Sequence, residues 1–455
     1  MYVAPQTTVS LDGPKPRFTP ILLLSTLVTA LGGLLFGFDT AVISGSTASL
    51  TRIFHLSPGL LGFTVSSALI GTIIGALIAG RAAERYGRRA SLVAAALAYL
   101  ISAIGCAVAL NWDMLLIFRI IGGVGIGGSS VLGPMYIAEI APAKWRGRLV
   151  GCFQLNIVAG ILFAYLSNYV IGLQNYGNLE WRVELGVAAV PALIFLIMLI
   201  FIPHSPRWLV KQNRSAEALQ ILHRIGEADP TAELQRMETM WQEEQNNRDD
   251  RLFIPAHRKP IVLALIMGVF CQLSGINAVL YFLNDIFAAA GYSAVSGSAR
   301  GIVIGCTNVI FTILAMLCID RFGRRFLLMI GSIAMTITLG CISYLFHSKS
   351  HPEWLLWFLV MYCASFAFSE GAVMWVYISE IFPLNVREKG QSLGSISHWI
   401  TNAIISGCFP AIAAVSKSLP FCFFAAMMAL QFVLVYTLFP ETRNQSLETN
   451  AQQVA

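Results

Sequence analysis

The chain has 455 residues, of which 56% are hydrophobic and 12% are charged, with a formal net charge of +6. Soluble domains have about a quarter of their residues charged, so this composition excludes an ordinary water-soluble protein. The basic residues gather in short connections between apolar segments, and no nucleic-acid partner is needed to explain the net charge.

The apolar residues fall in runs of about 20, each long enough to cross the hydrocarbon core of a bilayer as a helix. An isolated strand in lipid leaves its backbone polar groups unsatisfied, so every run is predicted to be helical. The predicted fold class is an all-α membrane protein with twelve transmembrane helices. The runs lie at about 18–45, 59–80, 90–110, 114–138, 149–171, 183–203, 260–290, 300–319, 326–346, 354–379, 390–416 and 419–439.

The first run contains a carboxylate, Asp39, among apolar and small residues between Gly32 and Gly45. A carboxylate at this depth is costly unless it is paired, hydrated or protonated, and such residues usually mark an ion or substrate pathway. In the fourth run Arg119 precedes a stretch rich in glycine, which lets helix backbones approach closely. We therefore expect the guanidinium of Arg119 to lie near Asp39.

The connections between the runs predict the orientation of the chain. By the positive-inside rule, the connections that carry clustered Lys and Arg face the cytoplasm. An even number of spans then places both termini on that side. The basic connections are Arg81 to Arg89, Lys144 to Arg148, Arg321 to Arg325 and Arg387 to Lys389.

One long polar stretch, about 204–258, interrupts the runs after the sixth. Its segments 216–225 and 232–245 have amphipathic helical patterns with many charges, so we expect a cytoplasmic helical linker. The predicted organisation is a cytoplasmic tail 1–17, an N-terminal six-helix half 18–203, the linker 204–258, a C-terminal six-helix half 259–440 and a cytoplasmic tail 441–455.

Three motifs of the first half recur in the second half in the same order and at nearly one offset, which is hard to obtain by chance. The basic motifs stay on one side of the membrane, so the repeat contains an even number of spans, and six fits. This indicates two halves related by an axis along the membrane normal. The corresponding motifs begin at Glu84 and Asp320, at Tyr136 and Tyr377, and at Pro203 and Pro440.

Together with the run Gln272-Leu-Ser-Gly-Ile-Asn-Ala, these motifs resemble the sugar porter family of the major facilitator superfamily. The resemblance covers about residues 25–448. It implies a twelve-helix transporter whose two halves rock about a central site for a monosaccharide or a polyol.

A sugar is neutral and covered with hydroxyl groups, so its site needs side chains that donate and accept, and an apolar wall for the ring. Each hydrogen bond contributes only about 1 kcal/mol against water, so several must converge. A lone Gln or Asn in a membrane helix is also often a simple helix–helix hydrogen bond. The sugar-binding residues that the resemblance implies are Gln154, Gln272, Asn277, Asn308 and Trp375, with Phe36 and Tyr281 as walls.

Three departures from the family pattern lie beside this proposed site, so the substrate is not inherited from familiar glucose or xylose carriers. Cys271 replaces the first of two adjacent glutamines, and Ala372 replaces a proline after Gly371, with Glu370 just before. His398 stands where Asn or Gln is usual in the eleventh span. Three roles stay open for His398: a sugar ligand, a second titrating group, or a buried histidine with a satisfied partner.

The resemblance also implies how transport is driven. In similar porters an Asp in the first span pairs with an Arg in the fourth, and carriers with Asn there are usually uniporters. Asp39 with Arg119 therefore implies proton symport, in which protonation of Asp39 releases Arg119. No cofactor is expected, and the proton is the coupling ion.

Acid and base residues at the inner helix ends recur at matched spacings in both halves. The resemblance implies a cytoplasmic network of ion pairs between helices, which closes the inner gate in the outward-facing state and breaks on rocking. His204 replaces the glutamate usual in this motif, so that corner of the network is expected to be weaker or pH-dependent. The predicted network is Glu84, Arg85, Arg89, Glu139 and Arg146 in the first half, and Asp320, Arg321, Arg325, Glu380 and Arg387 in the second.

We therefore predict a proton-coupled monosaccharide symporter of the bacterial inner membrane or plasma membrane, working as a monomer with sugar and membrane lipid as its partners. The first alternative is a facilitative uniporter with a structural Asp39–Arg119 pair, and the second is a non-transporting sugar sensor. No nucleophile–base or metal constellation points to an enzyme. No phosphate-binding loop of the G-x-x-x-x-G-K-[ST] type points to a primary pump.

Overall fold

The structure is a computed structural model that describes residues 16–246, 252–383 and 386–443. The predicted tails 1–17 and 441–455 lie almost wholly outside the described residues. All the regular structure in the described part of the chain is helical, as the sequence predicts.

Twelve helical segments of the described chain are long and apolar enough to cross a membrane, which confirms the predicted fold class. In the first half they are α1 (Pro20–Phe54), α2 (Pro58–Tyr86), α3 (Arg88–Ala107), α4 (Trp112–Ile140), α5 (Arg146–Leu173) and a sixth span containing α6 (Glu180–Gly186) and α7 (Ala189–Met198). In the second half they are a span of α11 (Arg258–Leu273) and α12 (Ile276–Tyr281), then α14 (Ala294–Phe322), α15 (Arg324–Ser348), a span containing α16 (Leu355–Phe368) and α17 (Glu370–Ile381), α18 (Arg387–Val415) and α19 (Leu419–Leu438).

The first helix is longer than predicted, because it continues past residue 45 to Phe54. At 35 residues it is about 50 Å long, which exceeds the ~30 Å hydrocarbon core. Its polar last turns therefore project beyond the hydrocarbon, where hydropathy no longer marks the helix. Its start is fixed by the Thr19 side chain, which accepts a hydrogen bond from the backbone N–H of Leu22.

Two spans of the second half are interrupted near their middle. Gly275, with φ of +84°, separates α11 from α12, and Ser369 separates α16 from α17. Irregular backbone at membrane depth is tolerated only where it is buried in protein or lines a cavity. The two breaks therefore place Gln272, Asn277 and Glu370 on backbone specialised for a site.

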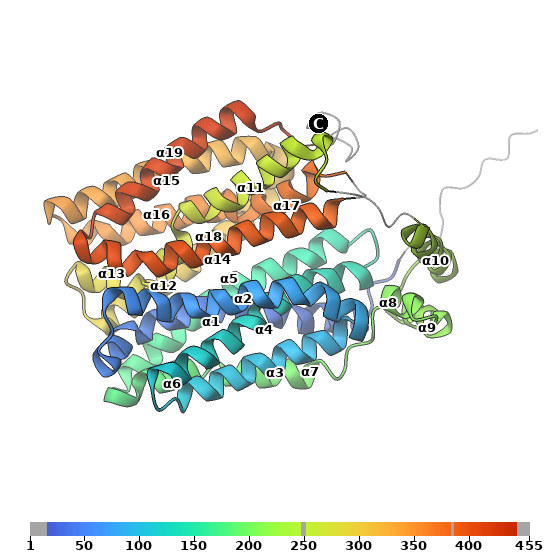
Figure 1. The fold of residues 1–455 in the computed structure, drawn as a ribbon, viewed down its shortest axis with the longest axis horizontal. Coiled ribbons are helices and arrows are strands. Elements are labelled where there is room, and N and C mark those ends of the chain that lie inside the picture. The colour runs from blue at the N-terminus through green and yellow to red at the C-terminus, as the bar shows by residue number, and fades with distance from the viewer. Residues whose placement is uncertain (1–15, 247–251, 384–385, 444–455) are drawn as a thin grey trace, which may run out of the picture.

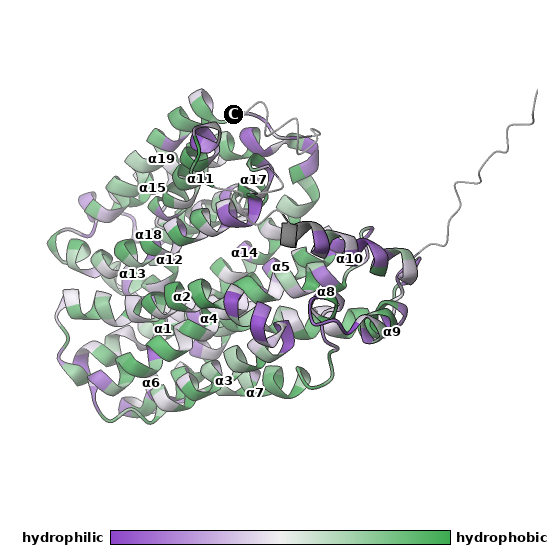
Figure 2. Ribbon diagram, turned by 45° about the vertical axis from the view of Figure 1, so that its right-hand side comes forward, coloured by the Kyte–Doolittle hydropathy of each residue, from purple (hydrophilic) through white to green (hydrophobic). Residues whose placement is uncertain are grey.

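The helices form two bundles that lie side by side (Figure 1), one built from α1–α7 and the other from α11–α19, which includes the short α13 (Leu283–Ala289). The helices that connect the two bundles in the sequence lie at one end of the molecule and form the predicted helical linker. They are α8 (Pro206–Lys211), α9 (Ser215–Ile225) and α10 (Pro230–Asn246). Figure 2 shows hydrophilic residues on this linker and at the neighbouring helix ends, whereas the helix sides are hydrophobic. Exposed apolar residues such as Leu77, Leu317 and Ile404 cover those sides, as expected for a surface in contact with lipid.

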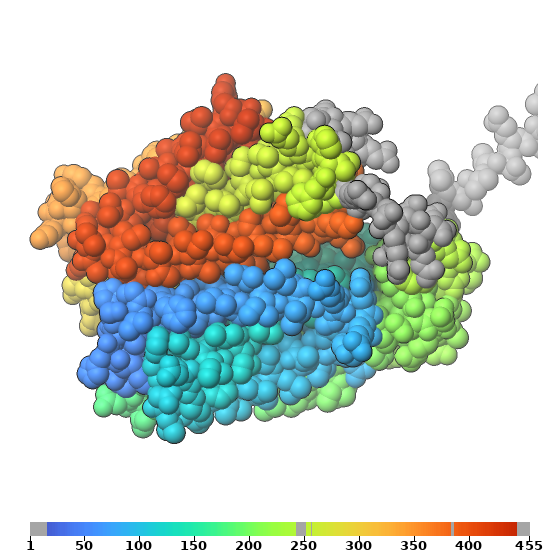
Figure 3. Space-filling view, in the orientation of Figure 1, coloured from blue at the N-terminus to red at the C-terminus, as the bar shows by residue number. Residues whose placement is uncertain are grey.

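The two bundles touch at the end remote from the linker. There a Cβ atom added to Gly62 of α2 would lie 1.9 Å from the carbonyl oxygen of Gly407 on α18. The Tyr165 hydroxyl of α5 also donates a hydrogen bond to the carbonyl of Leu280 on α12, at 3.0 Å. At the linker end Figure 3 shows a hollow between α2 and α18. The molecule is therefore closed on the far side and open on the linker side.

Candidate functional site

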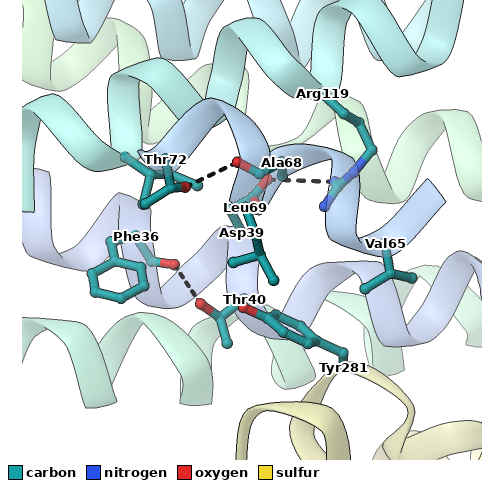
Figure 4. A pocket seen from close by; sticks show the side chains of 10 residues that line it. Phe36, Asp39, Thr40, Val65, Ala68, Leu69, Thr72, Arg119 and Tyr281 are labelled. Carbon is teal, nitrogen blue, oxygen red and sulfur yellow. Dashed lines mark hydrogen bonds and ion pairs between the residues drawn. The ribbon is translucent and has the colours of Figure 1, made fainter. Parts of the chain in front are cut away.

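The predicted pair of Asp39 and Arg119 is present at membrane depth. An Arg119 Nη1 lies 3.6 Å from an Asp39 carboxylate oxygen, and Arg119 is almost fully buried whereas Asp39 is about one quarter exposed. Both residues line a small pocket, with Thr40, Thr72 and Tyr281 among its other walls (Figure 4). The carboxylate is thus paired but still reachable, which is the arrangement that a proton-binding group requires.

Tyr281 connects this pocket to the other half of the molecule. It belongs to α12, yet its ring lies beside Thr40 of α1 in Figure 4. The Thr40 hydroxyl itself donates to the carbonyl of Phe36 at 2.9 Å. The sequence prediction missed Thr40 and Thr72. Thr40 directly follows Asp39 in the sequence, whereas no sequence signal marked Thr72.

A chain of hydrogen bonds joins three of the predicted sugar ligands. The Nε2 of Gln272 lies 2.9 Å from one ring nitrogen of His398, and its Oε1 accepts from Asn277 Nδ2 at 3.1 Å. Because the amide nitrogen is a donor, the His398 nitrogen that faces it acts as an acceptor and is unprotonated. In this conformation His398 therefore has a satisfied partner, and that partner is itself a proposed ligand.

Aromatic rings line one side of this group. The ring of His398 lies 5.4 Å from the Trp375 ring of α17 and 5.1 Å from the Trp399 ring of α18. Trp399 in turn lies 5.4 Å from the Phe36 ring of α1. These contacts bring residues of both halves together and offer the apolar wall that a sugar ring needs. Trp399 was absent from the predicted ligands.

The other two predicted ligands lie on the neighbouring pair of helices. Asn308 of α14 is buried and Gln154 of α5 is half-buried, and these two helices pack against each other. No hydrogen bond of the described structure joins either side chain to Gln272. The structure therefore unites Gln272, Asn277 and His398 with the aromatic wall, and leaves Gln154 and Asn308 as separate polar positions.

At the linker end, each half contains the same buried ion pair. Arg88 donates to Glu139 at 2.7 Å, and Arg324 donates to Glu380 at 2.8 Å. A hydroxyl from the chain that follows each half adds a second donor to the carboxylate, Ser205 in the first half and Thr442 in the second. Arg88 and Arg324, which the predicted network omitted, are thus the partners of the two predicted glutamates. The sequence prediction had grouped these glutamates with Arg146 and Arg387 instead.

The predicted Arg89 and Arg325 donate to backbone carbonyl groups and not to the two glutamates. Arg89 donates to the carbonyl groups of Leu199 and Ile200, and Arg325 donates to that of Tyr436. They tie the start of α3 and of α15 to the ends of α7 and α19.

The remaining predicted gate residues are placed as follows. Asp320 pairs with Arg324 at 3.0 Å and is largely exposed. Buried nitrogens of Arg387 have no hydrogen-bond partner among the described residues. Within the part of the chain that the structure describes, no ion pair of at most 4.0 Å is found between the two halves. The other residues lie at exposed positions: Glu84, Arg85, Arg146 and Arg321.

His204 breaks the symmetry of the two inner clusters. Its counterpart in the second half, Glu441, accepts hydrogen bonds from the backbone N–H groups of Arg324 and Arg325 at the start of α15. His204 instead stacks on Trp208, and its buried Nδ1 has no hydrogen-bond partner in the described part of the chain. Burial, and secondarily the nearby Arg89, lowers the pKa of His204.

Three comparisons with known proteins agree on one family. A family model described as "Sugar (and other) transporter" matches residues 25–453. The chain is 38% identical over 436 residues to the arabinose-proton symporter of Bacillus subtilis (strain 168), covering 94% of each chain. It is 36% identical over 461 residues to the D-xylose-proton symporter of Escherichia coli (strain K12), covering 93% of this chain and 94% of that one.

The structure is also similar to a solved one, the partially occluded inward open conformation of the xylose transporter XylE from E. coli. The TM-score is 0.84 at 34% sequence identity, covering 93% of this chain and 99% of that chain. The likeness to an inward open state agrees with the hollow at the linker end (Figure 3).

Proposed function

The chain belongs to the sugar transporter family, and we propose that it imports a monosaccharide together with a proton by alternating access. The protein crosses the membrane twelve times and is a transporter rather than an enzyme. The observation that carries the proposal is the Asp39–Arg119 pair, which lies at membrane depth and shares a pocket with Tyr281 from the opposite half.

The coupling step follows from the charge of that pair. When Asp39 takes up a proton, its attraction for Arg119 is lost, and the pocket no longer holds an ion pair between α1 and α4. The added proton leaves the site with the single positive charge of Arg119, and the attraction that held α1 to α4 no longer opposes their relative movement. One proton moving down ~100 mV supplies about 2.3 kcal/mol, enough for roughly fifty-fold accumulation of a neutral sugar.

The substrate class follows from the hydrogen-bonding groups. Gln272 and Asn277 each combine a donor and an acceptor, and Trp375 offers a partly exposed aromatic face beside them. Such a set suits the hydroxyl groups and the C–H face of a hexose, pentose or related polyol. Because two relatives are named for arabinose and D-xylose, a pentose is the first substrate to test. Competition by hexoses, pentoses and polyols against labelled uptake would rank the candidates.

The setting of the protein is part of the proposal. We place it in a bacterial inner membrane or plasma membrane, with the linker and the hollow on the cytoplasmic side, because the basic connections lie at that end. The working unit is a monomer surrounded by lipid, since one chain supplies residues of the site from both halves.

The test is uptake into proteoliposomes with and without an imposed proton gradient. Wild type should concentrate labelled sugar only when the gradient is present. Asp39→Asn keeps the shape and polarity of the side chain but exchanges no proton, so uphill accumulation should be lost. Binding of the sugar and its counterflow exchange should persist, because the hydroxyl-matching residues lie on other helices.

The outcomes separate the alternatives. If wild type never exceeds equilibration, the protein is a facilitative uniporter with a structural Asp39–Arg119 pair. If sugar binds but neither equilibrates nor exchanges, it is a sensor. If Asp39→Asn still concentrates sugar, the coupling proton is bound elsewhere.

A further inference from the structure

A second carboxyl group lies deep in the other half of the molecule. Glu370 is the first residue of α17, at the break in the tenth span, and its exposure is 0%. Both of its carboxyl oxygens are buried and have no hydrogen-bond partner among the described residues. Asp39 has a cation at 3.6 Å, whereas no ion pair of Glu370 is found within residues 16–246, 252–383 and 386–443.

Among the described residues no cation faces Glu370, and the side-chain amide of Gln431 is the one neighbouring group that can donate to its carboxylate. Cys271 of α11, Tyr362 of α16 and Gln431 of α19 are its titratable or polar neighbours, and none of them is a cation. The Tyr362 hydroxyl is already used, because it donates to the carbonyl of Ser274 at 2.8 Å. The start of a helix favours a negative charge, but this effect is smaller than the cost of a fully buried and unpaired carboxylate.

The neighbouring Gln431 also has a buried polar atom without a hydrogen-bond partner among the described residues. It is 1% exposed, it lies beside the Glu370 carboxyl, and its Oε1 is a buried acceptor without a donor. Two acceptors that share a dry space are both unsatisfied when neither carries a hydrogen. A proton on Glu370 would turn its carboxyl into a donor to that oxygen, and it would remove the buried charge at the same time.

We propose that Glu370 is a second proton-binding site of this transporter, and that in the inward-open conformation its carboxyl is protonated and donates a hydrogen bond to Gln431. The bound species is a single proton taken from water by the carboxylate. The bond ties the start of α17 to α19, and Trp375 lies five residues further along the same helix. Loss of the proton would leave a bare charge in the bundle, so release requires α17 to move away from its present packing.

The experiment reads the protonation state of Glu370 directly. Infrared spectra of the purified full chain in lipid at neutral pH distinguish the carbonyl stretch of a carboxylic acid from the stretches of a carboxylate. The spectrum of wild type minus that of Glu370→Gln should show a lost carboxylic-acid band and no lost carboxylate band. A lost carboxylate band would overturn the proposal.

Two further variants serve as controls. Asp39→Asn should give the opposite difference, a lost carboxylate band, because that group has a cationic partner at 3.6 Å. Gln431→Leu should leave the Glu370 acid band in place but move it to the higher frequency of an acid without an acceptor. An unmoved band would show that Gln431 is not the partner.

The proposal also predicts that Glu370→Gln folds, because a neutral amide replaces a neutral acid of nearly the same shape. Its thermal midpoint in detergent should stay close to that of wild type, and failure to fold would count against a protonated carboxyl. This inference deepens the proposed proton coupling without depending on it. Accumulation assays test Asp39, whereas the infrared bands test Glu370, so each can fail alone.

Discussion

At the scale of single residues, Gln272 has the most constrained position in the sugar site. Its amide nitrogen is directed at His398 and its amide oxygen receives Asn277, so neither end of the amide can turn without breaking a bond. A side chain held in this way is already oriented before a sugar arrives, which lowers the entropy cost of binding. His398 thereby acts through Gln272 in this conformation and holds the amide in place.

Gln272→Ala and Asn277→Ala should each weaken sugar binding by about 1–3 kcal/mol, because partners of the lost amide are left unsatisfied. Gln272→Ala should have the larger effect, since it also releases His398. Isothermal titration calorimetry on folded protein measures both. Gln174→Ala, at an exposed position after α5, is the matched control and should bind as wild type does.

Unchanged affinity in both Gln272→Ala and Asn277→Ala would place the pocket elsewhere. A loss in the Gln174→Ala control would instead show that the assay reports on general damage.

At the scale of elements, α3 and α15 begin in the same way but differ in how their first backbone N–H groups are satisfied. Each begins after a glycine with a strongly positive φ, Gly87 at +86° and Gly323 at +90°, a region that side chains with a Cβ rarely adopt. Each presents backbone N–H groups that have no partner within the helix. Glu441 satisfies two such groups on α15, whereas no side chain caps α3.

His204→Glu should therefore stabilise the protein by about 0.5–2 kcal/mol, because the new carboxylate can accept from the first amides of α3 as Glu441 does for α15. Thermal unfolding in detergent at neutral pH measures the change. His204→Gln, which adds no charge, is the control and should gain less.

The same histidine also gives a pH dependence with a defined sign. The pKa of His204 is lowered in the folded protein, so the unfolded chain takes up this proton first as the pH falls below about 6.5. Stability should decrease over that range in wild type and less in His204→Gln. A larger acid loss in His204→Gln would contradict the lowered pKa.

At the scale of the whole molecule, the two halves touch at the end remote from the linker, and transport requires them to rock about these contacts. The contact between α2 and α18 depends on Gly62, whose backbone lies against the carbonyl of Gly407. The ion pairs of Arg88 with Glu139 and of Arg324 with Glu380 at the linker end each connect helices within one half. We call this contact of α2 with α18, at the end remote from the linker, the outer gate. In the present state close backbone packing holds it closed.

Gly62→Val should keep the outer gate from closing, because its Cβ would stand 1.9 Å from a backbone oxygen that cannot swing away. Overpacking of this kind costs about 1–3 kcal/mol, enough to shift the population by roughly 5- to 140-fold toward the outward-open form. Spin-label distances between the outer ends of α2 and α18 should lengthen, and net sugar uptake should fall. The exposed Cys408 and Cys422 are best removed beforehand, since labels would react there.

Gly59→Ala is the matched control for this variant, because a Cβ atom at Gly59 meets nothing within 4 Å. It should leave both the distance and the uptake unchanged. Equal distances in Gly62→Val and wild type would mean that another contact closes the outer gate.

The amino-acid sequence alone determined the class and the plan of this protein. Apolar runs of membrane length predict helices because no other structure satisfies the backbone in lipid, and the recurring motifs predict two equivalent halves. Asp39 with Arg119, and Gln272 with Asn277, were also predictable. A carboxylate in an apolar helix must be paired, hydrated or protonated, and the resemblance to sugar porters marked Gln272 and Asn277 as ligands.

Only the tertiary structure decided which members of each motif meet. In the two Arg-Arg pairs the first arginine turns inward to the glutamate, because the helix starts immediately after the glycine and directs that side chain toward the neighbouring helix. Glu370 is fully buried because side chains of α11, α16 and α19 cover it, and α11 and α19 are far from it in the sequence. Burial sums the contributions of many distant residues, whereas a motif records only its own neighbours along the chain.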